Sequence, residues 1–78
     1  MNSILISCRP HPNMNNFGWQ AFVVSIPEEF DKKNYLFDSL ANCSIIRTTE
    51  IKAINELEVV ITNICDKFNV KEYIIRRI

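Results

Sequence analysis

The sequence predicts a small α+β domain: a mixed four-stranded sheet with one long amphipathic helix packed on one face. Three patterns support this prediction. Apolar side chains alternate over residues 3–9 and 17–26, recur at helical spacing over 50–68, and alternate again over 71–78. A short second helix is also expected, giving the order strand, strand, short helix, strand, long helix, strand. At 78 residues, the whole of 1–78 is expected to form a single domain.

The first two strands are predicted to form an antiparallel hairpin. In residues 3–9, Ile4, Ile6 and Cys8 share one face. A loop rich in proline and asparagine follows, and residues 17–26 then form the strongest strand pattern. One face of that strand carries Phe17, Trp19, Ala21 and Val23, and the other carries Gln20, Phe22, Val24 and Ile26.

The middle of the chain predicts a short helix and a short strand. Pro27 ends the second strand, and residues 28–42 have apolar side chains at roughly helical spacing. That spacing involves Phe30, Phe37, Leu40 and Ala41, with Leu36 beside them. Asp31 or Asn34 is expected to cap the start of the helix. Residues 44–48, with Ile45 and Ile46, are expected to form the third strand.

The long helix over 50–68 is the clearest element. Its predicted apolar stripe consists of Ile51, Ile54, Leu57, Ile61, Ile64 and Phe68, with Cys65 beside it. Thr49 is a suitable N-cap, Glu50 and Lys67 suit the two ends of the helix dipole, and Asn69 suits a left-handed termination. Its glutamates Glu50, Glu56 and Glu58 fall mostly off the stripe, so we expect them to be solvated.

Both faces of the predicted sheet carry apolar residues. In the last strand Tyr73 and Ile75 oppose Ile74 and Ile78. A sheet with one helix over it needs only one apolar face. Two interpretations remain open: the short helix covers the second face, or another subunit or protein does so.

The composition restricts the classes of function that we expect for this chain. Nine basic and nine acidic residues give zero net charge, which argues against a general nucleic-acid binder. No stretch is long and apolar enough to span a bilayer, and the N-terminus lacks the pattern of a secretory signal. Together with the odd number of cysteines, this leads us to expect a cytoplasmic protein with reduced thiols and no membrane association.

The best candidate for partner binding is the loop that contains Met14, Asn15, Asn16, Phe17 and Trp19. Tryptophan is enriched at interface hot spots, methionine packs adaptably, and asparagine supplies polar contacts. The alternative is that Phe17 and Trp19 are core residues at the start of a strand.

No catalytic site, metal site or cofactor is predicted. Cys8 and His11 have a Cys-x-x-His spacing, but a structural zinc site needs four ligands and a nucleophilic pair needs a third, orienting group. The acidic cluster Glu28, Glu29 and Asp31 precedes two lysines and indicates a solvated segment. No phosphate-binding loop or hydrolase motif is present.

These observations lead us to expect a small non-enzymatic protein-binding module. Its size and neutral charge are typical of inhibitors, immunity proteins and phage or mobile-element accessory proteins, which act by blocking a partner. One alternative is a nucleic-acid-associated module that stacks bases on Trp19, Phe17 and Tyr73, with Arg9, Arg76 and Arg77 near phosphates. Another alternative is a homodimeric structural protein.

Overall fold

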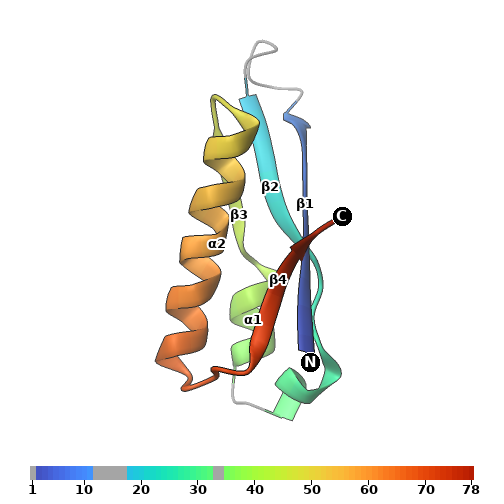
Figure 1. The fold of residues 1–78 in the computed structure, drawn as a ribbon, viewed down its shortest axis with the longest axis vertical. Coiled ribbons are helices and arrows are strands. Elements are labelled where there is room, and N and C mark those ends of the chain that lie inside the picture. The colour runs from blue at the N-terminus through green and yellow to red at the C-terminus, as the bar shows by residue number, and fades with distance from the viewer. Residues whose placement is uncertain (1, 12–17, 33–34) are drawn as a thin grey trace.

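A computed structural model describes residues 2–11, 18–32 and 35–78, and Figure 1 shows the arrangement of their elements. The elements in chain order are β1 (Asn2–His11), β2 (Gly18–Ser25), the 3-10 helix η1 (Glu28–Lys32), α1 (Leu36–Ala41), β3 (Ser44–Arg47), α2 (Glu50–Lys67) and β4 (Tyr73–Arg77). The predicted α+β class and element order are therefore confirmed, and the predicted short helix is split into η1 and α1.

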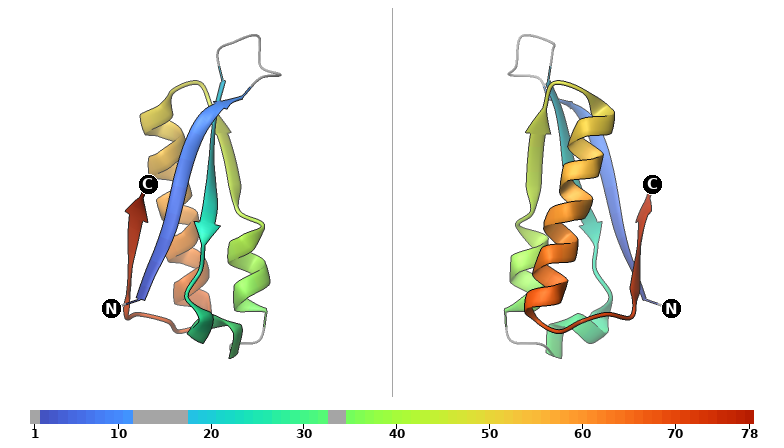
Figure 2. Two further views of the ribbon diagram at one scale, coloured as in Figure 1. Left: turned by 90° about the vertical axis from the view of Figure 1, so that its right-hand side faces the viewer. Right: turned by 60° about the vertical axis from the view of Figure 1, so that its left-hand side comes forward.

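The four strands form one mixed sheet in the order β3-β2-β1-β4. β1 pairs antiparallel with β2 and parallel with β4, and β2 pairs antiparallel with β3. β3 and β4 therefore run in the same direction at opposite edges of the sheet, and α2 connects them across one face (Figures 1 and 2). Because β1 and β2 occupy the centre of the sheet, the chain passes from β3 at one edge to β4 at the other edge through α2.

The start and end of α2 follow the predicted capping. The Thr49 hydroxyl accepts a hydrogen bond of 3.2 Å from the backbone N–H of Lys52. This bond satisfies one of the donors that a helix start leaves without an internal partner. Beyond the C-terminal end, Asn69 adopts the left-handed conformation with φ 60°. Val70 then donates its N–H to the carbonyl of Cys65 at 2.8 Å and turns the chain toward β4.

The buried stripe of α2 follows the predicted one except at Ile51. It consists of Ala53, Ile54, Leu57, Ile61 and Cys65. Ile51, predicted to lie in the stripe, is 73% exposed, whereas Ile64 and Phe68 are half-buried and pack against the same core. With about 3.6 residues per turn, Ala53 and Cys65 lie at the two opposite margins of the predicted stripe, so the stripe keeps its predicted direction and gains these two small residues.

The position of α1 shows whether the short helix covers the second face of the sheet. Leu36 and Leu40 of α1 are fully buried in the same core as α2, so the interpretation that the short helix covers the opposite face is wrong. Phe37, predicted to be buried, is 36% exposed. The N-cap is Tyr35 rather than the predicted Asp31 or Asn34. Tyr35 has φ 61° and makes no side-chain cap bond.

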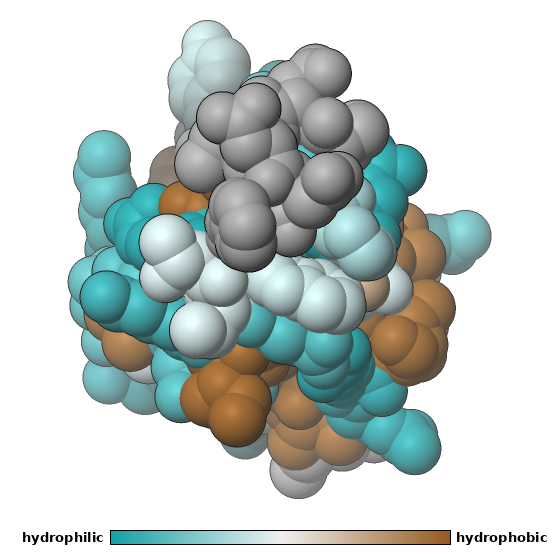
Figure 3. Space-filling model, turned by 90° about the horizontal axis from the view of Figure 1, so that it is seen from above, coloured by the Kyte–Doolittle hydropathy of each residue, from teal (hydrophilic) through white to brown (hydrophobic). Residues whose placement is uncertain are grey.

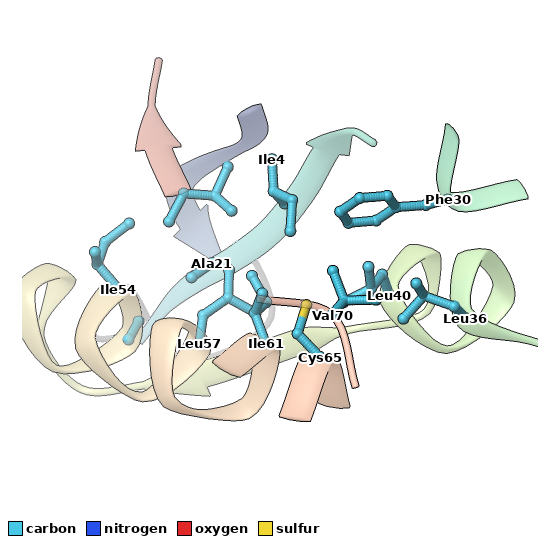
Figure 4. Close-up of a cluster of buried hydrophobic side chains, with 12 residues drawn as sticks. Ile4, Ala21, Phe30, Leu36, Leu40, Ile54, Leu57, Ile61, Cys65 and Val70 are labelled. Atoms are coloured by element: carbon cyan, nitrogen blue, oxygen red, sulfur yellow. The ribbon is translucent and has the colours of Figure 1, made fainter. Parts of the chain in front are cut away.

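One hydrophobic core lies between the sheet and the helices (Figure 4). It contains Ile4, Ile6, Ala21, Phe30, Leu36, Leu40, Ala53, Ile54, Leu57, Ile61, Cys65 and Val70. The β1–β2 register shifts beside Leu5, which leaves Val24 without a partner on β1. Such a bulge reverses the alternation that follows it, and Ile26 therefore packs against the core instead of sharing the face of Phe22.

Two ion pairs join α2 to the edge strands. Arg47 of β3 lies 2.6 Å from Glu56, and Arg77 of β4 lies 2.5 Å from Glu50. Glu50 and Glu56 thus keep part of their surface exposed to water, and each also pairs with an arginine. Both pairs are partly exposed, so each contributes little to stability. They do fix the side of the sheet toward which Arg47 and Arg77 point, which is the side of α2.

Candidate functional site

The strongest candidate site is the sheet face opposite α2, which we call the uncovered face. Strand alternation and the ladder register assign to it Ser3, Leu5, Ser7, Arg9, His11, Gln20, Phe22, Ser25, Ser44, Ile46, Ile74 and Arg76. Figure 2 shows that no helix of the described part of the chain lies over this face. In Figure 3 hydrophobic side chains line the right-hand margin, the side of the sheet away from α2 in Figure 1.

The uncovered face has an apolar side chain from every strand. Leu5, Phe22 and Ile46 are half-buried, and Ile74 is 40% exposed. Serines and Gln20 lie between them, and Gln20 donates a hydrogen bond of 2.8 Å to the hydroxyl of Ser44. The predicted second apolar face is thus mixed rather than continuous. Its composition suits a surface that meets water when free and another molecule when bound.

The charge on the uncovered face has one sign. Its arginines are Arg9 and Arg76, and none of the described strand residues on this face is an aspartate or a glutamate. The guanidinium carbon of Arg9 lies 5.0 Å from the centroid of the Phe22 ring. This cation–π contact holds an aromatic and a positive charge together at the surface. The face therefore matches a partner with apolar and acidic groups.

The loop predicted to bind a partner falls largely outside the described residues. That is the case for Met14, Asn15, Asn16 and Phe17. Trp19 is described: it is half-buried, packs against the core and lies opposite Arg47 in the β2–β3 ladder. It therefore lies on the α2 side of the sheet, as the core interpretation expects. Neighbouring Gly18 is buried at the start of β2.

Cys8 and His11 do not form a reactive pair. Cys8 packs against the core, and alternation along β1 places His11 on the other face of the strand. Burial raises the pKa of the Cys8 thiol, and the Glu50 carboxylate raises it further, against opposing effects of Arg77 and the Arg9 backbone. A nucleophilic cysteine needs the opposite shift. In His11 the Nδ1 atom is buried without a hydrogen-bond partner among the described residues.

The other two cysteines are structural as well. Burial raises the pKa of Cys43, whose thiol donates to the carbonyl of Ser39 at 3.3 Å. Burial also raises the pKa of Cys65 at the centre of the core, where a hydrogen bond with Tyr73 opposes the shift. All three cysteines are free. In residues 2–11, 18–32 and 35–78, no three His, Cys, Asp or Glu side chains gather as metal ligands would.

The residues of the nucleic-acid alternative are divided between the two faces. Arg9 and Arg76 lie on the uncovered face, whereas Trp19, Tyr73 and Arg77 lie on the α2 side. Burial raises the pKa of Tyr73, and the neighbouring Thr62 hydroxyl of α2 opposes that shift. The aromatic on the uncovered face is instead Phe22. The alternation of residues 17–26 placed Phe22 on the face opposite Trp19 and Ala21, but it did not show which of the two faces meets the core.

A groove of about 530 Å³ lies between α2 and the outer edge of β4. It exists because α2 lies over β2 and β3 rather than over β4. Its lining is Glu58, Thr62, Asp66, Val70, Lys71, Tyr73 and Ile75. The groove is broad and open, so it does not enclose a small molecule, but it leaves the backbone edge of β4 accessible from the side.

Comparison of the chain with protein-family models, curated proteins and solved structures gives no match. Within the part of the chain that the structure describes, no helix is both long and apolar enough to cross a membrane.

Proposed function

We propose that this protein is a small non-enzymatic protein-binding module that binds through its uncovered face and blocks the partner surface that it occupies. The observation that carries this proposal is the position of α1 and α2 on the same side of the sheet, so that no helix of the described residues covers Leu5, Phe22, Ile46 and Ile74. An inhibitor, immunity protein or phage accessory protein acts in this way, with a rigid surface and no chemistry.

The apolar side chains supply the driving force in this proposal. Removing apolar surface from water stabilises a complex by roughly 25 cal/mol per Å² before the cost of association. Phe22 is the largest of them and lies on a central strand, which is where interface hot spots concentrate. Because the half-buried Phe22 ring already stacks against Arg9, it loses little conformational freedom on binding.

The two arginines define the chemistry of the partner. Arg9 stacks on Phe22, so its guanidinium group is held beside the apolar centre with donors left for a carboxylate. Arg76 supplies a second positive charge beside Leu5. The proposed partner therefore presents an apolar patch bordered by aspartate or glutamate side chains.

The test is affinity capture from the cells that make the protein, with three baits. The wild type is compared with Phe22→Asp, which places a carboxylate at the centre of the uncovered face, and with Val59→Asp as the matched control. Val59 is a 58% exposed residue of α2, on the opposite side of the molecule. A protein retained by wild type and Val59→Asp and lost with Phe22→Asp supports the proposal. Equal retention by all three baits contradicts it.

A second function is favoured by one observation. The Arg9–Phe22 pair lies on a face without carboxylates, and base stacking beside a guanidinium group is a mode of binding single-stranded nucleic acid. A titration of labelled single-stranded RNA and DNA at increasing salt distinguishes the two functions. Affinity for nucleic acid falls steeply with salt because counterions are released. An apolar protein interface responds far less.

A further inference from the structure

The outer edge of β4 carries free backbone groups in a defined pattern. Ile78 donates its N–H to the carbonyl of Ile6 on β1 at 2.9 Å. In a strand the N–H and C=O of one residue point to the same side, and the side alternates with each residue. Ile74 and Arg76 therefore direct their backbone groups to β1 as Ile78 does. Tyr73, Ile75 and Arg77 direct theirs away from the sheet.

This edge is open to a further strand. β4 is the last strand of the sheet, and the groove beside it is lined by its own Tyr73 and Ile75. Exposed edges of this kind pair with other strands unless charges, a proline or a covering element block them. β4 carries Arg76 and Arg77, so pairing at this edge requires a register in which arginines do not lie opposite each other. No described helix or strand covers the outer edge of β4 (Figure 2).

We propose that two copies of this chain associate by antiparallel pairing of β4 with β4 of the second copy, centred on Ile75. In this register Ile75 lies opposite Ile75, and Tyr73 lies opposite Arg77 of the second copy. The residues with outward backbone groups thus face one another and form the hydrogen-bonded pairs. The two sheets join into one sheet of eight strands.

The side chains of β4 favour this register over its neighbours. When the pairing is centred on Ile75, Ile74 lies opposite Arg76 of the second copy, and no two like charges lie opposite each other. A pairing centred on Arg76 would place the two Arg76 side chains opposite each other. A pairing centred on Ile74 would place Lys71 of one copy opposite Arg77 of the other. Like charges directly opposite are destabilising. The register on Ile75 also uses the whole of β4.

The groove supplies charge complementarity. Arg77 of the second copy would project on the α2 side, beside Tyr73, where Glu58 and Asp66 line the groove. In the single chain Arg77 contacts Glu50 through one guanidinium nitrogen and is 45% exposed. Since arginine has five N–H donors, it can keep that contact and meet a carboxylate of the second copy.

The symmetry has a consequence for the uncovered face. In antiparallel pairing, residues directly opposite share a face, so the twofold axis is perpendicular to the sheet. Both uncovered faces then lie on the same side of the dimer. This inference goes beyond the proposed function and does not depend on it: the dimer can form whether or not the face binds a partner.

The test uses the full chain and a pair of variants matched in position. Ile74 lies on the uncovered face of β4, where Ile74→Arg places a positive charge opposite Arg76 of the second copy and Ile74→Glu places a negative charge there. The dimer dissociation constant is measured by sedimentation for the wild type and both variants. We expect it to rise about tenfold with Ile74→Arg, because two symmetry-related pairs become repulsive. With Ile74→Glu it is expected to stay the same or fall.

Amide hydrogen exchange provides the second readout and does not depend on a variant. Protection of the Tyr73, Ile75 and Arg77 amides should increase with protein concentration, while the amides of Ile74 and Arg76 are protected at every concentration. Thermal unfolding of both variants at low concentration checks that they fold. A wild type that stays monomeric at about millimolar concentration overturns the proposal. Equal weakening by both variants, or concentration-dependent protection at β3 instead of β4, also overturns it.

Discussion

The guanidinium carbon of Arg9 lies 5.0 Å from the centroid of the Phe22 ring, and both residues lie on the sheet face that no described helix covers. Alternation along β1 and β2 brings them together: Arg9 is opposite Gln20 and Ser7 is opposite Phe22, so the pair is diagonal across neighbouring strands. The contact joins an apolar ring to a fixed positive charge at the centre of the proposed binding face.

Removal of Arg9 should affect stability only modestly. For Arg9→Ala we expect the free energy of unfolding to fall by about 0.5–1 kcal/mol, the usual contribution of a solvent-exposed cation–π pair. Arg76→Ala is the matched control on the same face, because Arg76 lies beside Leu5 rather than over a ring. Urea unfolding of both variants checks the prediction. An equal effect of the two substitutions would show that the ring contact contributes nothing specific.

The exposure of Ile51 makes a sharp prediction for α2. Leu57 is fully buried and Ile51 is 73% exposed, although the periodicity of the sequence places both in one stripe. Leu57→Ala should lower the free energy of unfolding by about 2–5 kcal/mol through lost burial and a cavity. Ile51→Ala should change it by less than about 0.5 kcal/mol. A large loss with Ile51→Ala would mean that the side chain of Ile51 is buried and that the first turn of α2 packs differently on the core.

The contribution of the α2 N-cap to stability can be measured by comparing substitutions at two adjacent threonines. Thr49 accepts the hydrogen bond from the Lys52 N–H, whereas exposed Thr48 makes no such bond. Thr49→Ala should cost about 1 kcal/mol of stability. Thr48→Ala should cost only a few tenths, which we expect thermal unfolding at matched concentration to resolve. Similar losses for both would place the start of the helix elsewhere.

Stability should fall at alkaline pH. Burial raises the pKa of Cys8, Cys43 and Cys65 above the ordinary value of 9.0, and that of Tyr73 above 10.0. The unfolded chain therefore ionises these groups at lower pH than the folded chain and binds fewer protons there. Their contribution is complete below pH 9.0 and is lost as the pH rises through the raised values. Urea unfolding between pH 7 and 11 tests this, and a constant free energy across that range would contradict it.

The raised pKa of Cys8 predicts that its thiol reacts slowly with alkylating reagents. Its thiolate is disfavoured first by burial and then by Glu50, so alkylation of the folded protein should reach its half-maximal rate at a higher pH than alkylation of the urea-unfolded chain. Mass spectrometry of iodoacetamide adducts resolves the three cysteines. Preferential alkylation of Cys8 near neutral pH would revive a nucleophilic role.

Much of the fold could be predicted from the sequence because periodicity is a local signal. Alternation identified the strands and Thr49 and Asn69 identified the limits of α2, since each depends on neighbouring residues alone. The position of α1 could not be predicted. Leu36 and Leu40 are apolar enough to cover either face of the sheet, and only the path of the chain after β2 decides which one.

The candidate site was predicted less well, for a related reason. The sequence directed attention to Trp19, a residue type common at interfaces, but Trp19 packs on the α2 side. Phe22 became the central residue only once both helices were placed opposite it. The bulge at Val24 also had no sequence signal, and it moved Ile26 from the uncovered face to the core.

The most direct test of the central claim is photo-crosslinking in the cells that make the protein. The photoreactive amino acid p-benzoyl-phenylalanine is introduced at Phe22 on the uncovered face in one strain and at exposed Val59 on α2 in another. Binding through the uncovered face predicts an adduct with another protein from position 22 and none from position 59. An adduct from position 59 alone would contradict the account, and so would adducts from position 22 that contain only this chain or nucleic acid.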